Sequence, residues 1–197
     1  MPGDVQGDRE QLLASAERGG DGVVAGRRPR RRMAFALAGA VAAALWAVQQ
    51  PIDKRLSGSG YDDVEFLGKA VTRGRGWRPI GFAMHVANGA LFGLAYSALW
   101  RRTPGIDSRL SAHVAVQAEN FGLFPLTALS DRLHPAVVDG EIPRLSGSRR
   151  ALAQATWRHA ILGVVLGEVG RRLDPAVQER RHAPWNLAAG ADTPQNQ

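Results

Sequence analysis

The sequence predicts an all-α protein, a bundle of four transmembrane helices with a short amphipathic interfacial helix in the first outer loop. Three observations support this prediction. The charged residues are segregated along the chain, the uncharged segments have the length of a membrane span, and small and polar residues recur within them at helical spacing. The chain has 197 residues, of which 45% are hydrophobic, so a single domain with a sizeable core is expected.

Four windows of the sequence contain almost no charge. The chain has 25 basic and 18 acidic side chains, but only three of them lie in the 80 residues of these windows. Each window is 18 to 21 residues long, close to the roughly 20 residues that a helix needs to cross the hydrocarbon core. A soluble amphipathic helix would carry a charge at nearly every turn of its outer face. The predicted spans are residues 33–50, 80–100, 110–130 and 151–170.

The four windows differ in their polarity. The first contains no charged side chain but is rich in Ala, and the second is the best candidate for a membrane span. The third and fourth are semi-polar and would be poor spans alone, so they are expected to turn their polar stripes toward other helices. Two alternatives remain open: a soluble basic helical bundle, and a signal peptide in the first window.

The segments that flank these windows predict the domain organisation and the topology. Residues 1–32 are expected to be a disordered basic tail, 33–175 the membrane domain, and 176–197 a disordered C-terminal tail. The tail ends in an arginine-rich run at 27–32, which by the positive-inside rule places both termini in the cytoplasm of a multi-pass inner or plasma membrane protein. Because Met33 follows this run directly, translation starting at Met33 is an alternative.

The first outer loop predicts the interfacial helix. Val64, Leu67 and Val71 recur at helical spacing, with acidic residues before them and Lys69 near the end. Trp77 and Trp100 bracket the second span, as interfacial anchors do.

One general resemblance supports this organisation. The four short spans, with polar residues inside the later ones, occur together with PIDKRL at 51–56 and YDDVE at 61–65. This pattern resembles small bacterial four-helix integral membrane proteins of uncharacterised function. The resemblance covers most of residues 33–175 and implies no activity and no catalytic residue.

Glycine spacing predicts close helix packing. Small residues one turn apart allow two helix backbones to approach closely in a bilayer. We therefore expect the second and fourth spans to pack through these faces, or one of them to form a homo-oligomer. The predicted packing residues are Gly89 and Gly93 in the second span, and Gly163 and Gly167 in the fourth.

Polar residues on three spans predict a polar seam inside the bundle, because buried polar groups must be paired. Its members lie on narrow stripes of the second, third and fourth spans: His85, Asn88, Tyr96, His113, Gln117, Asn120, Gln154, Arg158 and Glu168. Depth along the helices predicts a His113–Glu168 hydrogen bond near the inner side, with Tyr96 as a further partner. Arg158 is expected to pair with polar groups of the outer half. Glu119 lies off its stripe, and the sequence does not place it.

The favoured function is a structural or interaction role in the membrane, with the lipid bilayer as partner. A transporter-like or channel-like protein with a path lined by His and Glu is the second hypothesis, and a soluble basic binding protein is the third. No catalytic motif is present, the chain has no Cys, and no cofactor, metal or nucleic acid is expected. A haem or metal site remains a weaker alternative, since His85, His113 and His159 lie at unequal depths on three spans.

Overall fold

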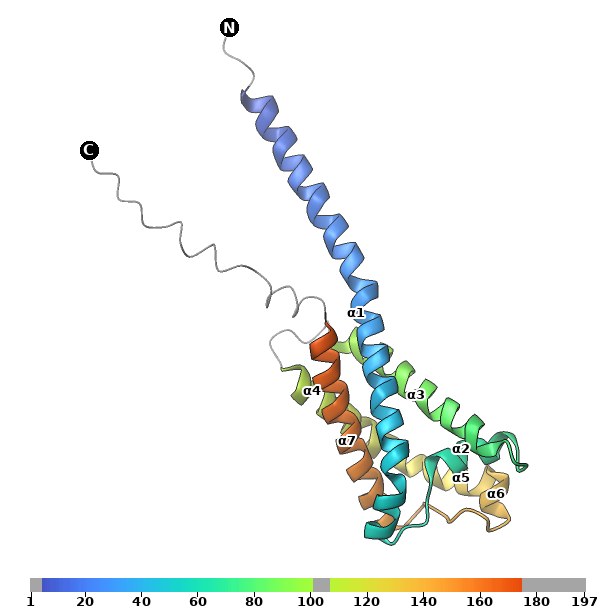
Figure 1. The fold of residues 1–197 in the computed structure, drawn as a ribbon. Coiled ribbons are helices and arrows are strands. Elements are labelled where there is room, and N and C mark those ends of the chain that lie inside the picture. Colours follow the sequence, from blue (N-terminus) through green and yellow to red (C-terminus); the bar gives the residue numbers. More distant parts are fainter. Residues whose placement is uncertain (1–4, 101–106, 175–197) are drawn as a thin grey trace.

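The computed structural model describes residues 5–100 and 107–174, and its regular elements within these ranges are all helices joined by loops and turns (Figure 1). Its elements are α1 (Val5–Ser57), α2 (Asp63–Val71), α3 (Trp77–Trp100), α4 (Ser108–Leu123), the 3-10 helix η1 (Phe124–Leu126), α5 (Thr127–Leu133), α6 (Pro135–Val138) and α7 (Arg149–Leu173). The prediction of an all-α fold is confirmed. The predicted C-terminal tail at 176–197 lies outside the described residues.

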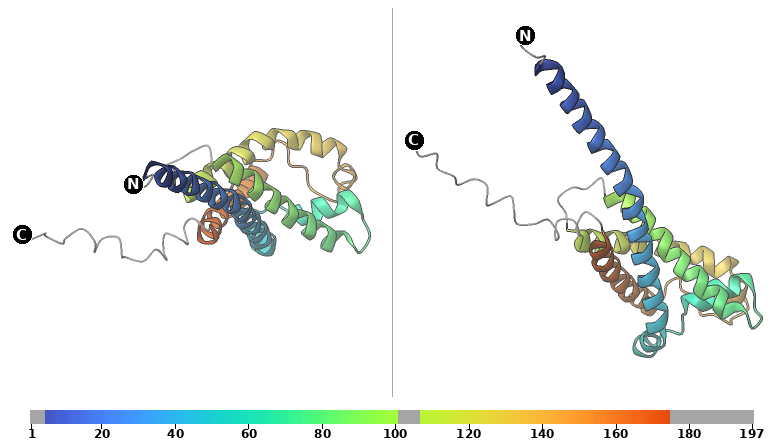
Figure 2. Two further views of the ribbon diagram at one scale, coloured as in Figure 1. Left: turned by 90° about the horizontal axis from the view of Figure 1, so that it is seen from above. Right: turned by 45° about the horizontal axis from the view of Figure 1, so that its top comes forward.

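The long helices are arranged around α1. It packs along α3 on one side and along α7 on the other, and α4 packs on the far side of α7. Figures 1 and 2 show α2, α5 and α6 gathered at the end of the bundle away from the chain termini. Aromatic, aliphatic and small side chains fill the centre of the bundle, among them Phe35, Ala42 and Trp46 of α1, Tyr96 of α3 and Leu166 of α7.

Two helices are long and apolar enough to cross a membrane, Pro29–Ser57 within α1 and Trp77–Leu99 within α3. Only 28% of the most apolar window of α3 is buried against the rest of the protein, and 50% of that of α1. The third and fourth predicted spans form helices too, α4 to α5 and α7, but neither meets the same criterion of length and hydropathy. By length and composition, two of the described helices are thus candidate membrane spans.

The N-terminal segment differs from the prediction. Residues 1–32 were expected to lack regular structure, whereas α1 begins at Val5 and continues through Pro29 to Ser57. Residues 9–18 are mostly strong helix formers, and this local propensity favours a helix although the segment has few apolar side chains. The far end of α1 stops at Gly58, whose φ of 62° suits the left-handed position that commonly follows a helix.

The amphipathic helix of the first loop is present as α2. The Asp62 side chain accepts a hydrogen bond from the backbone N–H of Glu65 and caps the helix, so α2 starts where the acidic residues predict. Gly68 and Gly81 bring α2 and α3 into backbone contact, because a Cβ on Gly81 would lie 1.9 Å from the carbonyl oxygen of Val64. Val64 is buried, whereas Val71 is 60% exposed.

The third predicted span is interrupted. The chain passes from α4 through η1, which contains Pro125, into α5. Proline has no backbone N–H and cannot complete the ladder of an α-helix at this point. Within α5, Asp131 is buried and accepts hydrogen bonds from the N–H groups of Leu145 and Ser146, at 3.0 and 2.8 Å. Asp131 thereby fastens the loop that leads into α7.

The contacts of Asp131 predict a loss of stability when its carboxylate is replaced. Each of its two oxygens accepts a backbone hydrogen bond from the loop before α7. Asparagine keeps one acceptor oxygen and replaces the other by an amino group that only donates. We expect Asp131→Asn to reduce the thermal stability of the protein, measured by circular dichroism in detergent. An unchanged melting temperature would contradict this role of Asp131.

Candidate functional site

The largest buried polar cluster is centred on Arg158 of α7, whose side chain is 1% exposed. Its guanidinium binds the Asp53 carboxylate in a bidentate manner, with Nε and Nη2 at 2.6 and 2.7 Å from the two oxygens. Its Nη1 donates to Asp63 at 2.6 Å, and Nη2 also donates to the Tyr61 carbonyl at 3.1 Å. One arginine therefore ties α7 to the end of α1, the following loop and the start of α2.

Other side chains complete this cluster. Gln154, one turn before Arg158, donates to Asp53 at 2.8 Å. Trp46 and Gln50 of α1 both donate to Asp63, at 3.0 and 3.2 Å. With the Gln49 amide as a further donor to Asp53, three of the four oxygens of the two carboxylates accept from more than one donor. A buried ion pair requires such additional donors.

The Arg158 cluster agrees with the prediction that Arg158 pairs near the end of the bundle farther from the termini. The sequence did not predict its two acidic partners, because Asp53 and Asp63 lie outside the uncharged windows, in the connection between the first two predicted spans. The spacing of Gln49 and Asp53 could have indicated that Asp53 belongs to a polar cluster. The two residues are four apart on the same helix, and the Gln49 amide donates to the Asp53 carboxylate at 2.7 Å.

The middle of the predicted seam joins α4 to α7. Gln117 donates to the backbone carbonyl of Thr156 at 3.1 Å, and Asn120 donates to the Thr156 hydroxyl at 3.3 Å. His85 of α3 is buried and packs its ring against Trp46 of α1, at 5.1 Å between centroids. Asn88, by contrast, is exposed on the surface of α3.

Near the other end of the bundle the predicted pairing is wrong. Glu168 does not bond His113; it accepts from Arg109 of α4 at 2.7 Å and from Arg171 and Arg172 of its own helix. Tyr96 bonds the Ser111 hydroxyl at 2.5 Å. The arginines at the helix ends are long enough to reach Glu168, and a guanidinium is a stronger donor to a carboxylate than a neutral imidazole.

The glycines form close contacts, but not between the predicted helices. A Cβ on Gly93 of α3 would lie 2.0 Å from the carbonyl oxygen of Phe35, and one on Gly89 would lie 2.5 Å from the Cβ of Ala43, so α3 packs on α1. Gly163 of α7 packs against His113 of α4, with a Cβ position 2.9 Å from its Cα. Gly167 is buried in α7. The expected packing of the second span on the fourth through these faces is therefore corrected, and both glycine pairs are buried within one chain.

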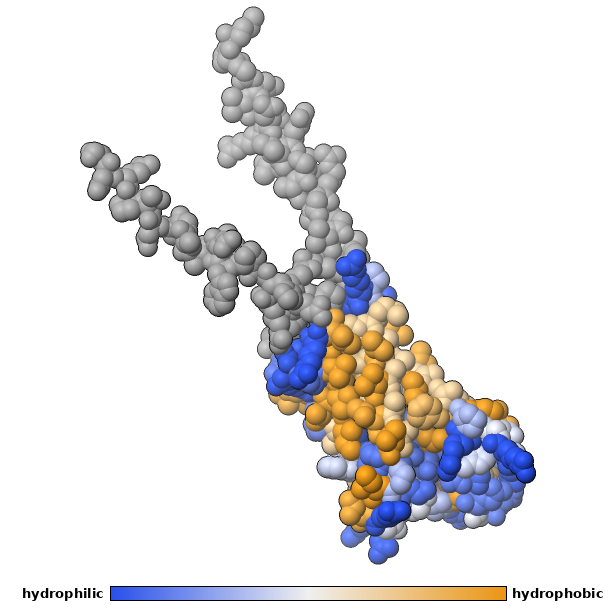
Figure 3. Space-filling view, in the orientation of Figure 1, coloured by the Kyte–Doolittle hydropathy of each residue, from blue (hydrophilic) through white to orange (hydrophobic). Residues whose placement is uncertain are grey.

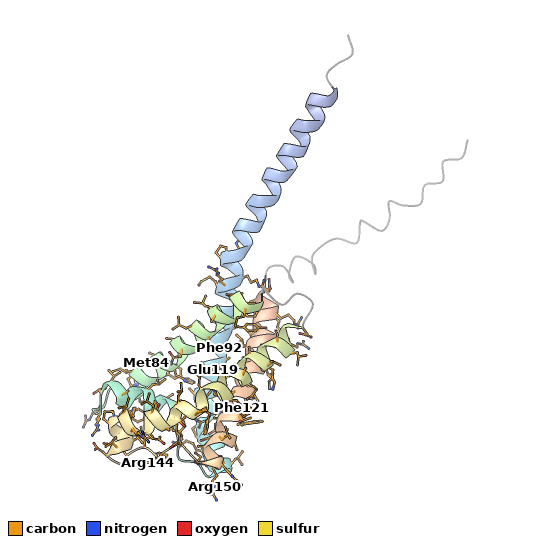
Figure 4. All side chains as sticks on the ribbon, turned by 180° about the vertical axis from the view of Figure 1, so that it is seen from behind. Met84, Phe92, Glu119, Phe121, Arg144 and Arg150 are labelled. Atoms are coloured by element: carbon orange, nitrogen blue, oxygen red, sulfur yellow. The ribbon has the colours of Figure 1, made fainter. Side chains whose placement is uncertain are left out.

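A cavity of about 410 Å³ lies between α3 and α4, and α1 and α7 also contribute to its lining. Five of its lining residues are aromatic: Trp46, Tyr61, Phe66, Phe92 and Phe124. Its polar side chains include Asp63, His85, Asn88, Glu119, Asn120 and His159. Figure 4 shows Phe92 on α3 and Glu119 on α4 in the region between these helices. Pockets of this size and composition are typical of small-molecule sites.

Glu119, which the sequence does not place, pairs with His159 in this cavity. The His159 Nε2 lies 3.1 Å from a Glu119 carboxylate oxygen, and its Nδ1 lies 2.7 Å from the backbone carbonyl of Ala155. Since a carbonyl oxygen can only accept, Nδ1 carries a proton. The His159 ring is thereby oriented with Nε2 toward the Glu119 carboxylate.

No group of three or more potential metal ligands occurs among the described residues. No protein-family model matches the chain, and comparison with curated proteins and with solved structures gives no match.

Proposed function

We propose that this chain is a multi-pass integral membrane protein in which α1, α3, α4 to α5, and α7 all cross the bilayer. The observation that carries the proposal is a belt of exposed apolar side chains. On α1 they recur every three or four residues along one face: Met33, Leu37, Val41, Leu45, Val48, Ile52 and Leu56, each between 37% and 83% exposed. Such a stripe faces an apolar environment or a partner, because monomeric soluble proteins rarely expose large contiguous apolar patches.

The other long helices carry the same feature. Exposed large apolar residues continue on α3, on α4 to α5, and on α7; examples are Leu91, Phe121 and Val164, at 61%, 55% and 60% exposure. Figure 3 shows apolar side chains in a broad zone between hydrophilic groups at both ends of the visible face. Because α4 and α7 contribute to this belt, we include them among the membrane helices, although their polar stripes lower their mean hydropathy.

In this proposal the polar seam has a structural role. The Arg158 cluster, the Gln117–Asn120–Thr156 contacts and the Glu168 arginine cluster join different helices or neighbouring turns, and they satisfy polar groups that lipid could not. The role is structural or one of interaction with partners, without catalysis. A second candidate, a transporter-like or binding function, is favoured by one observation: the cavity that contains the Glu119–His159 pair.

Membrane extraction tests the proposal. We expect the protein to stay in the membrane pellet after washing with high salt and with alkaline carbonate, and to be released only by detergent, because the apolar belt is in contact with acyl chains. Release by salt or carbonate would refute the proposal and favour a soluble basic protein. A peripheral membrane protein expressed in the same cells is the control for the carbonate wash.

Single cysteines test the orientation, since the chain has no native Cys that would react. Under the positive-inside rule both termini are cytoplasmic, and the loop before α7 lies on the opposite side. We expect a membrane-impermeant maleimide to label Ser146→Cys in intact cells, and to label Arg32→Cys only after permeabilisation. The reverse pattern would invert the proposed topology.

A further inference from the structure

The cavity opens within the apolar belt. Two of its lining residues, Asn88 of α3 and Leu123 of α4, are exposed, so the cavity reaches the surface between these helices. The neighbouring Leu91 and Leu126 are 61% and 56% exposed and belong to the apolar belt. A molecule that enters here comes from the hydrocarbon region of the membrane, given the proposed membrane location.

The charges of the cavity are opposite to those of the whole chain. The protein has 25 Lys and Arg residues against 18 Asp and Glu residues and a formal charge of +7. Among the residues that line the cavity, however, two are carboxylates, Asp63 and Glu119, and none is Lys or Arg. Asp63 is neutralised by Arg158, which leaves Glu119 as the carboxylate whose only partner in the described contacts is a histidine.

The aromatic residues of the cavity, like its carboxylates, favour a cationic ligand. Five aromatic side chains lie among its 20 lining residues, although aromatic residues make up only 7% of the chain. Aromatic faces attract cations through their quadrupole, and the attraction grows when the cation is desolvated. A carboxylate beside aromatic rings in an apolar cavity therefore complements a large organic cation with an apolar body, and it disfavours an anion of the same shape.

We infer that this cavity is a binding site for a lipophilic organic cation that enters from the membrane and is held by the Glu119 carboxylate and the surrounding aromatic rings. This inference deepens the second candidate function, because it names the chemical class of its ligand. Glu119 is the residue that distinguishes a cation from a neutral or anionic molecule, and Phe92 and Trp46 contribute the contact surface on either side of the cavity.

The test compares two ions of the same size and shape and of opposite charge. Purified protein in detergent is titrated with tetraphenylphosphonium and, separately, with tetraphenylborate, by isothermal titration calorimetry. We expect saturable binding of the cation only. Glu119→Gln keeps the size of the side chain and removes its charge, and we expect it to weaken cation binding at least tenfold.

Glu168→Gln is the matched control, because it makes the same change at a carboxylate that is remote from the cavity lining and bonded by three arginines. It should bind tetraphenylphosphonium as the unaltered protein does. Equal binding of both ions, full cation affinity in Glu119→Gln, or no saturable cation binding by a protein with an intact helical spectrum would each overturn the inference. The assay is made in detergent, so a negative result leaves the carbonate test of membrane location unaffected.

Discussion

Replacing Arg158 by leucine is expected to destabilise the protein by about 3–5 kcal/mol, the cost of leaving buried carboxylates without their partner. Asp53 is 2% exposed and would lose both guanidinium hydrogen bonds, and Asp63 would lose its cationic partner. Arg158→Lys should recover little of this loss, because a single ammonium cannot reproduce the bidentate contact and the bond to Asp63 at the same time. The measurement is reversible unfolding in mixed detergent micelles, followed by tryptophan fluorescence.

Two further variants make this prediction specific. Arg150→Leu alters an exposed arginine of the same helix and should change the free energy of unfolding by no more than about 0.5 kcal/mol. Adding Asp53→Asn to Arg158→Leu should restore part of the stability, since the uncompensated charge is then removed. Equal losses in Arg158→Leu and Arg150→Leu would show that the cluster does not stabilise the fold.

Gly93→Ala is expected to destabilise the contact between α1 and α3 by about 2–3 kcal/mol, although it adds only one methyl group. The new Cβ would lie 2.0 Å from the carbonyl oxygen of Phe35 and 2.7 Å from its carbonyl carbon. Both are backbone atoms of a long helix and cannot rotate away, so α3 must move away from α1. That movement would also loosen the packing of Tyr96 against Phe35, whose rings are 5.3 Å apart.

Gly122→Ala is the matched control for this substitution. Gly122 also lies in a helix, but a Cβ there meets no atom within 4 Å. Alanine should therefore stabilise α4 slightly, by up to about 1 kcal/mol, through its higher helix propensity. If Gly93→Ala and Gly122→Ala changed stability in the same direction, close backbone packing would not be the reason for glycine at position 93.

The sequence predicted the helical class and most of the helix positions, because both follow from local patterns. Uncharged windows and the acidic start of α2 act through residues near in the chain, whereas the interruption of the third span at Pro125 was not predicted. It also predicted that Arg158 needs polar partners, since a charge within an apolar segment is costly wherever the helix packs. The helical structure from Val5 into the basic segment was not predicted. Helix propensity favours a helix there, whereas the low hydrophobicity favours disorder.

The partners themselves were decided by the tertiary structure. Asp53 and Arg158 are 105 residues apart in the chain, and only the packing of α1 on α7 brings them together. The same packing places Gly93 against α1 instead of α7, and it places Glu119 beside His159. It also brings Glu168 within hydrogen-bond distance of arginines instead of His113. Spacing along one helix fixes which residues share a face. Which other helix meets that face depends on the fit of all the helices at once, and this fit created the cavity that contains Glu119.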